Sequence, residues 1–136
     1  MRYLIDTNVF MDYIFEDHIP PDVFEIIINR EHIVYVSSES IKEFIHLVKT
    51  KKIVLKKELS AIDVFCLIED TFCFCVKYVA KEHLRTFFDL DLVEGHNDPS
   101  DRLIIAQAIT EKIPIISSDK KFPKYRKQGL EFIPNY

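Results

Sequence analysis

The chain has 136 residues and 48% of them are apolar, which is enough for one hydrophobic core, so we expect residues 1–136 to form a single domain. No apolar run is long enough to span a membrane and no secretory signal region is visible, so we expect a cytoplasmic protein without a membrane partner. The formal net charge of −4 excludes a surface that coats nucleic acid broadly, but it does not exclude a nuclease whose metal site is itself acidic.

Short apolar strands and helices alternate along the chain. In order, the patterns predict a strand at 2–6, an amphipathic stretch with Val9, Phe10 and Tyr13, a helix from Pro20–Pro21 to about Asn29, a strand at 33–36, a helix at 37–49, a helical segment at 59–71, a strand at 74–77, a helix at 80–88, a loop at 95–100, a helix from Pro99 to about Glu111, and strands at 114–117 and 130–133. This alternation indicates an α/β domain with a mainly parallel sheet.

The same patterns predict which side chains are buried. The core positions expected in two of the helices are Val23, Phe24, Ile26 and Ile27, and Ile41, Phe44, Ile45 and Val48. The three cysteines, Cys66, Cys73 and Cys75, are odd in number and form no C-x-x-C pair, which favours free thiols over a zinc site. Because Cys73 and Cys75 lie in an apolar stretch, we expect them in the core.

Four acidic residues stand at the ends of strands or in the first turns of helices. Asp6 and Asp119 each follow a predicted strand, whereas Glu43 and Asp101 lie near the starts of predicted helices. In parallel α/β sheets these positions share one edge, where ligands bind. Converging carboxylates repel one another, and a hard divalent cation removes that repulsion. The sequence therefore predicts a Mg²⁺ or Mn²⁺ site that acts on phosphates.

Each acid also has a structural interpretation that the sequence leaves open. Asp6 could be a turn or helix-capping residue, and Glu43 could complete a capping box with Ser40. Asp101 could complement the helix dipole, and Asp119 could form an Asx-turn. All four would then have to fall on one edge independently, so the joint metal site is the preferred hypothesis.

Competing catalytic motifs are absent from the sequence. The only two glycines, Gly95 and Gly129, exclude a G-x-G-x-x-G loop and a P-loop. No serine or cysteine lies in a nucleophile elbow, and no H-E-x-x-H is present. His96 lies near Asp98 and could line the site, but a histidine on a surface loop is the preferred interpretation. Asp98 itself is expected to cap the helix that begins at Pro99.

At this point the sequence resembles a known family. Asp6-Thr7-Asn8 after the first strand resembles the opening of a PIN domain, and the run from His96 to Ala108 resembles the central motif of VapC-like toxins. The run from Ile115 to Asp119, followed by Phe122, resembles their final motif. The resemblance covers essentially the whole chain. It implies a three-layer α/β/α sandwich with a Mg²⁺- or Mn²⁺-dependent ribonuclease site, in the toxin of a toxin–antitoxin pair.

The resemblance also implies roles for individual residues. It assigns Asp6, Glu43, Asp101 and Asp119 to the catalytic, metal-binding quartet, and Asn8, Asp98 and Ser117 to accessory polar positions. Ser117 stands where the family often has threonine, and Ser100 stands where an aromatic residue is common. Separately from the resemblance, four cations near these motifs could hold RNA phosphates, with a solvated turn as the alternative role for the lysines: Arg102, Lys120, Lys121 and Lys124.

The resemblance also implies protein partners, and two other functions stay open. Members of the family often dimerise, and an antitoxin commonly blocks the site. Some of the 11 phenylalanines, among them Phe10, Phe15 or Phe44, could form an apolar face for such a partner instead of core. Two rivals stay open: a catalytically inactive binding module with this fold, and a small-molecule phosphohydrolase. Cleavage assays with RNA and with phosphomonoesters would separate the three.

Overall fold

Five parallel strands form one sheet in the computed structural model, which describes residues 1–136. The strands are β1 (Arg2–Ile5), β2 (Ile33–Ser37), β3 (Cys75–Lys77), β4 (Ile115–Ser117) and β5 (Phe132–Pro134). Their order across the sheet is β3-β2-β1-β4-β5. The sequence predicted all five strands and the parallel sheet, so the α/β fold class is confirmed.

Helices connect the strands. They are α1 (Thr7–Ile14), α2 (Pro21–Ile28), α3 (Ser38–Lys49), α4 (Ala61–Phe65), the π-helical turn η1 (Cys66–Thr71), α5 (Lys81–Asp89), α6 (Pro99–Glu111) and the 3₁₀-helix η2 (Phe122–Gln128). The segment predicted at 59–71 begins later than expected, because Ser60 and Asp63 form a capping box at the start of α4. The sequence did not predict η2. No helix has the length and apolarity that a membrane crossing requires.

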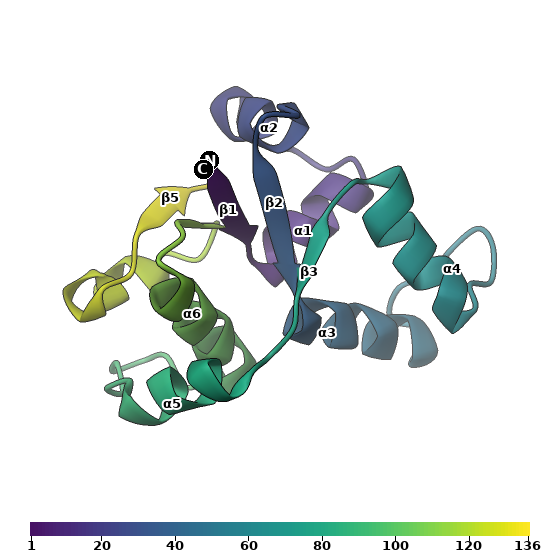
Figure 1. The fold of residues 1–136 in the computed structure, drawn as a ribbon. Coiled ribbons are helices and arrows are strands. Elements are labelled where there is room, and N and C mark those ends of the chain that lie inside the picture. Colours follow the sequence, from purple (N-terminus) through teal and green to yellow (C-terminus); the bar gives the residue numbers. More distant parts are fainter.

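The helices cover both faces of the sheet, as the predicted three-layer sandwich requires. Figure 1 shows α5 and α6 on one side of the strands and α1, α3 and α4 on the other. Side chains along a strand point alternately to the two faces. Tyr3 and Ile5 therefore pack with the α1 and α3 side chains, whereas Leu4 packs on the opposite face with α6 and η2. The sheet divides the core into these two clusters.

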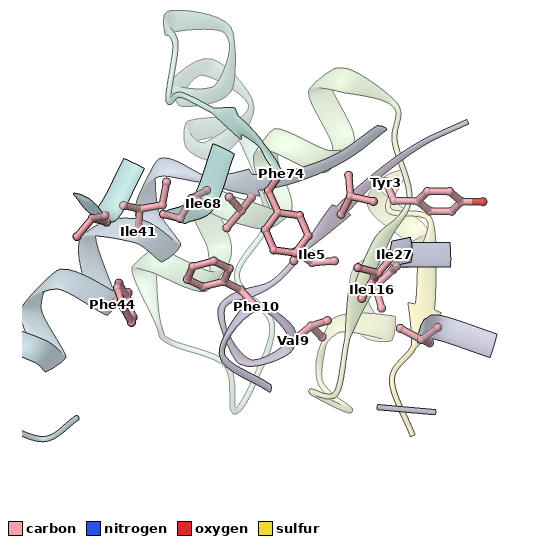
Figure 2. Close-up of a cluster of buried hydrophobic side chains, with 14 residues drawn as sticks. Tyr3, Ile5, Val9, Phe10, Ile27, Ile41, Phe44, Ile68, Phe74 and Ile116 are labelled. Carbon is pink, nitrogen blue, oxygen red and sulfur yellow. The ribbon is translucent and has the colours of Figure 1, made fainter. Parts of the chain in front are cut away.

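Several predicted burial assignments need correction. Phe10 and Phe44 are fully buried and pack edge to face at 5.9 Å between ring centroids, which confirms the core position of Phe44 and leaves Phe15, 38% exposed, as the accessible one of the three phenylalanines considered for a partner surface (Figure 2). Phe24, predicted to be buried, is 45% exposed: its ring is covered on one side by Tyr13, at 6.3 Å between ring centroids, and is open to solvent elsewhere. Cys73 and Cys75 are exposed, not buried, because they lie in the turn before β3 and on that edge strand. The thiols are free, as predicted.

The strand register brings distant residues to one level of the sheet. Ile5 pairs with Val36 on one side and with Ile116 on the other. The residues that follow these three, namely Asp6, Ser37 and Ser117, therefore stand at the same carboxyl edge. Asp6 caps α1 and Ser37 caps α3, so each strand passes directly into the helix that follows it.

Candidate functional site

Asp6 is a buried carboxylate at the carboxyl end of β1. Only 3% of the residue is exposed. One of its oxygens accepts a hydrogen bond from the backbone N–H of Val9 at 2.9 Å, and the other accepts from the hydroxyl of Ser117. Burial raises the pKa of Asp6 to about 7, and the charges of Asp101 and Asp119 add to the effect, while the hydrogen bonds from Ser117 and Val9 oppose it. Ionised Asp6 therefore needs a nearby positive charge.

Asp101 stands in the first turn of α6, which begins as the sequence predicted. Asp98 caps this helix and accepts from the N–H groups of Ser100 at 2.9 Å and Asp101 at 3.2 Å. Burial raises the pKa of Asp101 to about 6, and the charges of Asp98 and Asp119 raise it further, while His96 opposes the shift. The second acid of the edge is thus also destabilised in its charged form.

Asp119 follows β4 and is tied to Asp6 through a shared neighbour. The hydroxyl of Ser117 donates to Asp6 and accepts from the N–H of Asp119 at 3.0 Å. An oxygen of Asp119 accepts from the N–H of Lys121 at 2.8 Å, which is the Asx-turn left open by the sequence. The turn does not remove Asp119 from the cluster. Ser117 therefore holds the first and last motifs in a fixed relation.

His96 belongs to this cluster, which corrects the preference for a surface loop. Only 3% of the residue is exposed. Its Nε2 lies 3.4 Å from a carboxylate oxygen of Asp101. One potential ligand atom from each of His96, Asp101 and Asp119 lies within 4.8 Å of the others. These three side chains could together hold a metal ion.

Aromatic packing explains why the histidine is buried. Its ring meets Phe122 at 5.7 Å and Tyr125 at 5.4 Å, both edge to face. Both rings come from η2, which the sequence did not predict, since a short 3₁₀-helix leaves no helical apolar period. A local signal was present, however: Asp119, Phe122 and Tyr125 are spaced three residues apart, which is the repeat of a 3₁₀-helix.

Two of the four predicted ligands lie outside the group of His96, Asp101 and Asp119: Asp6, which is linked to Asp119 through Ser117, and Glu43. The side chain of Glu43 is exposed on α3 and makes no hydrogen bond or salt bridge. The alternative capping box with Ser40 is wrong, because Ser37 caps the helix and Ser40 is buried, with its hydroxyl 2.8 Å from that of Thr7. This contact places the first turn of α3 beside that of α1. Glu43 is one turn further along from Ser40.

The other residues assigned by sequence have distinct environments. Asn8 is exposed in the first turn of α1, whereas Ser117 is buried between two acids. Arg102 is partly buried, donates to the carbonyl of Leu90 at 3.0 Å and lies over the ring of Phe87. This gives Arg102 a structural role that the sequence did not predict. Lys120, Lys121 and Lys124 are exposed around the start of η2, next to Asp119.

Comparisons with known proteins identify the family and the fold. The family model for the PIN domain matches residues 3–128. Among solved structures, VapBC2 from Rickettsia felis bound to a promoter DNA fragment matches with a TM-score of 0.71 and 17% identity, over 98% of each chain. VapBC-1 from nontypeable Haemophilus influenzae matches with a TM-score of 0.68 and 14% identity, again over 98% of each chain. VapBC-5 from Mycobacterium tuberculosis gives 0.63 and 17% over the same shares. No curated protein sequence matches. At these identities the solved structures show a common fold.

Proposed function

The chain belongs to the PIN domain family, and on that premise we propose that it is a metal-dependent endoribonuclease that acts as the toxin of a toxin–antitoxin pair. The observation that carries the proposal is the buried carboxylate of Asp6 beside Asp101 and Asp119. None of the salt bridges in the protein brings a lysine or arginine to these acids. A cluster of carboxylates without a protein cation is the arrangement that a divalent ion stabilises.

The donor set fits Mg²⁺ or Mn²⁺. The oxygens of Asp6, Asp101 and Asp119 are hard ligands, and we propose that Glu43 joins them when its exposed side chain turns toward the edge. A divalent ion bound there would lower the pKa of a water and stabilise charge that develops on the phosphate.

The protein's own residues then position the reaction. Ser117 and the backbone of Val9 fix the carboxylate of Asp6, and the Asx-turn with Lys121 fixes one oxygen of Asp119. We propose that Glu43 or Asp119 orients the attacking water. RNA in single strands or loops is the proposed substrate class, because its phosphates and bases are accessible.

Incubation of the protein with a mixed RNA pool tests the proposed function. We expect cleavage with Mn²⁺ or Mg²⁺ and none with EDTA, because the carboxylates alone repel a phosphate. Mapping the cut ends would then give the sequence or loop that is recognised. Matched single-stranded DNA and a phosphomonoester serve as competing substrates. An intact, metal-loaded protein that cleaves no RNA would leave the inactive binding module as the better description.

Exposed lysines beside Asp119 are proposed to hold the RNA backbone. Each phosphate contact releases counterions, so binding should weaken steeply as salt increases. We expect replacement of Lys120, Lys121 and Lys124 by alanine to weaken binding across RNA sequences and to reduce the slope of log K against log salt by up to about 2. The measurement is a salt titration of RNA binding. Replacement of Lys51, Lys52 and Lys56, in the other basic segment, is the matched control, and an unchanged slope in the first variant would reject the contact.

Partners follow from the same proposal. The similar solved structures include VapBC complexes, and we propose a small antitoxin protein and a second copy of this chain as partners, in the cytoplasm. Exposed apolar side chains such as Phe24 and Phe88 support an interaction surface. Light scattering over a wide range of concentrations tests the dimer. Purification from the native locus without any small companion would contradict the antitoxin.

A further inference from the structure

His96, the neighbour of Asp101, makes a second and shorter contact with Tyr125. The Nε2 atom of His96 lies 3.4 Å from Asp101, and its Nδ1 atom lies 2.6 Å from the hydroxyl of Tyr125. Both His96 and Tyr125 are buried, so water does not compete for the contact between them, whereas the side chain of Asp101 is 27% exposed. The ring is also enclosed by the edge-to-face contacts with Phe122 and Tyr125. Its position and orientation are therefore determined by the protein.

The chemistry of the partners sets the direction of these hydrogen bonds. An ionised carboxylate can only accept, so the Nε2 atom that faces Asp101 must carry a proton. In the neutral imidazole, Nδ1 is then an acceptor, and the hydroxyl of Tyr125 must donate to it. The phenol can do so because a tyrosine, with an ordinary pKa of about 10, is protonated at neutral pH, and burial raises the pKa of Tyr125 further. The three residues form a chain of donors that ends on Asp101.

This chain connects the two segments that carry ligands. Asp101 lies five residues after His96, at the start of α6, and Tyr125 lies in η2, six residues after Asp119. A contact between His96 and Tyr125 therefore fixes the loop before α6 to the helix that follows Asp119. Ser117 already links Asp119 to Asp6 through hydrogen bonds. Asp6, Asp101 and Asp119 therefore belong to one connected network, and Glu43 is the proposed ligand outside it.

We propose that His96 is a positioning residue of the metal site, whose Nε2–H holds one oxygen of Asp101 so that the other is directed at the cation, while Tyr125 holds the imidazole in place. The inference rests on the proposed function, since it requires Asp101 to bind the metal. Partners that orient a ligand in this way typically change metal affinity by about 10- to 100-fold when removed. The histidine is not itself a ligand in this arrangement, because its Nε2 carries the proton.

Two substitutions of His96 distinguish positioning from packing. The amide nitrogen of glutamine reaches about as far as Nε2, whereas that of asparagine reaches only as far as Nδ1. We expect His96→Asn to weaken Mn²⁺ binding by about 10- to 100-fold, and His96→Gln to stay within about 3-fold of the wild type. Tyr125→Phe should weaken binding in the same direction, and adding it to His96→Asn should change little further, because both act through one contact. Isothermal titration with Mn²⁺ measures the four variants and the wild type.

A second buried histidine supplies the control. His83 is 4% exposed and accepts from the N–H of Ala80 at 2.9 Å at the start of α5. It contributes to no acidic cluster. We expect His83→Asn to lower the thermal unfolding temperature of the metal-free protein without changing its affinity for Mn²⁺. An equal loss of affinity in His83→Asn would show that general destabilisation is responsible and would overturn the assignment.

Pulsed electron paramagnetic resonance of the Mn²⁺-loaded protein provides the spectroscopic test. We expect no directly coordinated histidine nitrogen in the wild type. A nitrogen coupling that disappears in His96→Gln would make His96 a ligand and overturn the positioning role. A wild type that binds Mn²⁺ and cleaves RNA, with His96→Asn equal to it in affinity, would reject this inference and leave the proposed function intact. A wild type that neither binds Mn²⁺ nor cleaves RNA would reject both the proposed function and the positioning role of His96.

Discussion

Replacing Asp101 by asparagine is expected to reduce metal-dependent RNA cleavage by on the order of a thousandfold or more. The change keeps the shape of the side chain but removes the charge that holds the cation, and a bound metal contributes several kcal/mol to stabilising the transition state. The fold should survive, because Asp98 and not Asp101 caps α6. In the metal-free protein at neutral pH, stability should rise, since the variant loses its repulsion with Asp98 and Asp119. Single-turnover cleavage and thermal unfolding measure the two effects.

A closely matched acid is available as the control. Asp22 lies in the first turn of α2, which also begins with a proline, but it is exposed and belongs to no acidic cluster. We expect Asp22→Asn to cleave RNA at the wild-type rate. If Asp101→Asn stays folded and cleaves as fast as Asp22→Asn, Asp101 is not a metal ligand.

The parts of the site that follow strands could be predicted from the sequence. Asp6 and Asp119 each end an apolar run, and a parallel sheet places such positions at one edge. The register agrees with this placement, since Ile5 pairs with Ile116 and the residues that follow them, Asp6 and Ser117, are joined by a hydrogen bond. This prediction is strong because side chains alternate between the two faces of a strand. A shift of one residue in the pairing of two strands would move every apolar side chain to the wrong face.

The role of His96 could not be predicted in the same way. Its burial depends on two rings of η2 more than twenty residues later, and on a tertiary contact with Tyr125 that no local period encodes. The predicted burial of Phe24 was wrong for a related reason. The apolar pattern of α2 identifies a face that can be buried, but whether another element covers that face is a property of the whole fold.

The metal-free protein is expected to lose stability as the pH rises from 5 to 8. The pKa of Asp6 is about 7 in the folded protein, against 3.8 for an ordinary aspartate, so the folded state binds more protons than the unfolded state within this window. Its contribution is complete below the unfolded value and is lost as the pH passes the folded value. For Asp6 alone the loss from pH 5 to 8 is on the order of 2 kcal/mol. The raised pKa of Asp101 acts in the same direction.

Divalent metal should reverse this dependence on pH. Binding requires ionised carboxylates and releases their protons, so Mn²⁺ should stabilise the protein far more at pH 8 than at pH 5. Thermal unfolding at both pH values, with EDTA and with Mn²⁺, measures the effect. Asp6→Asn should remove most of the metal-free slope, because an amide does not titrate, and should also remove the stabilisation by Mn²⁺. Asp22→Asn should keep both. A metal-free stability that does not change between pH 5 and 8 would show that Asp6 ionises without cost, and the proposed need for a cation at this edge would lose its physical basis.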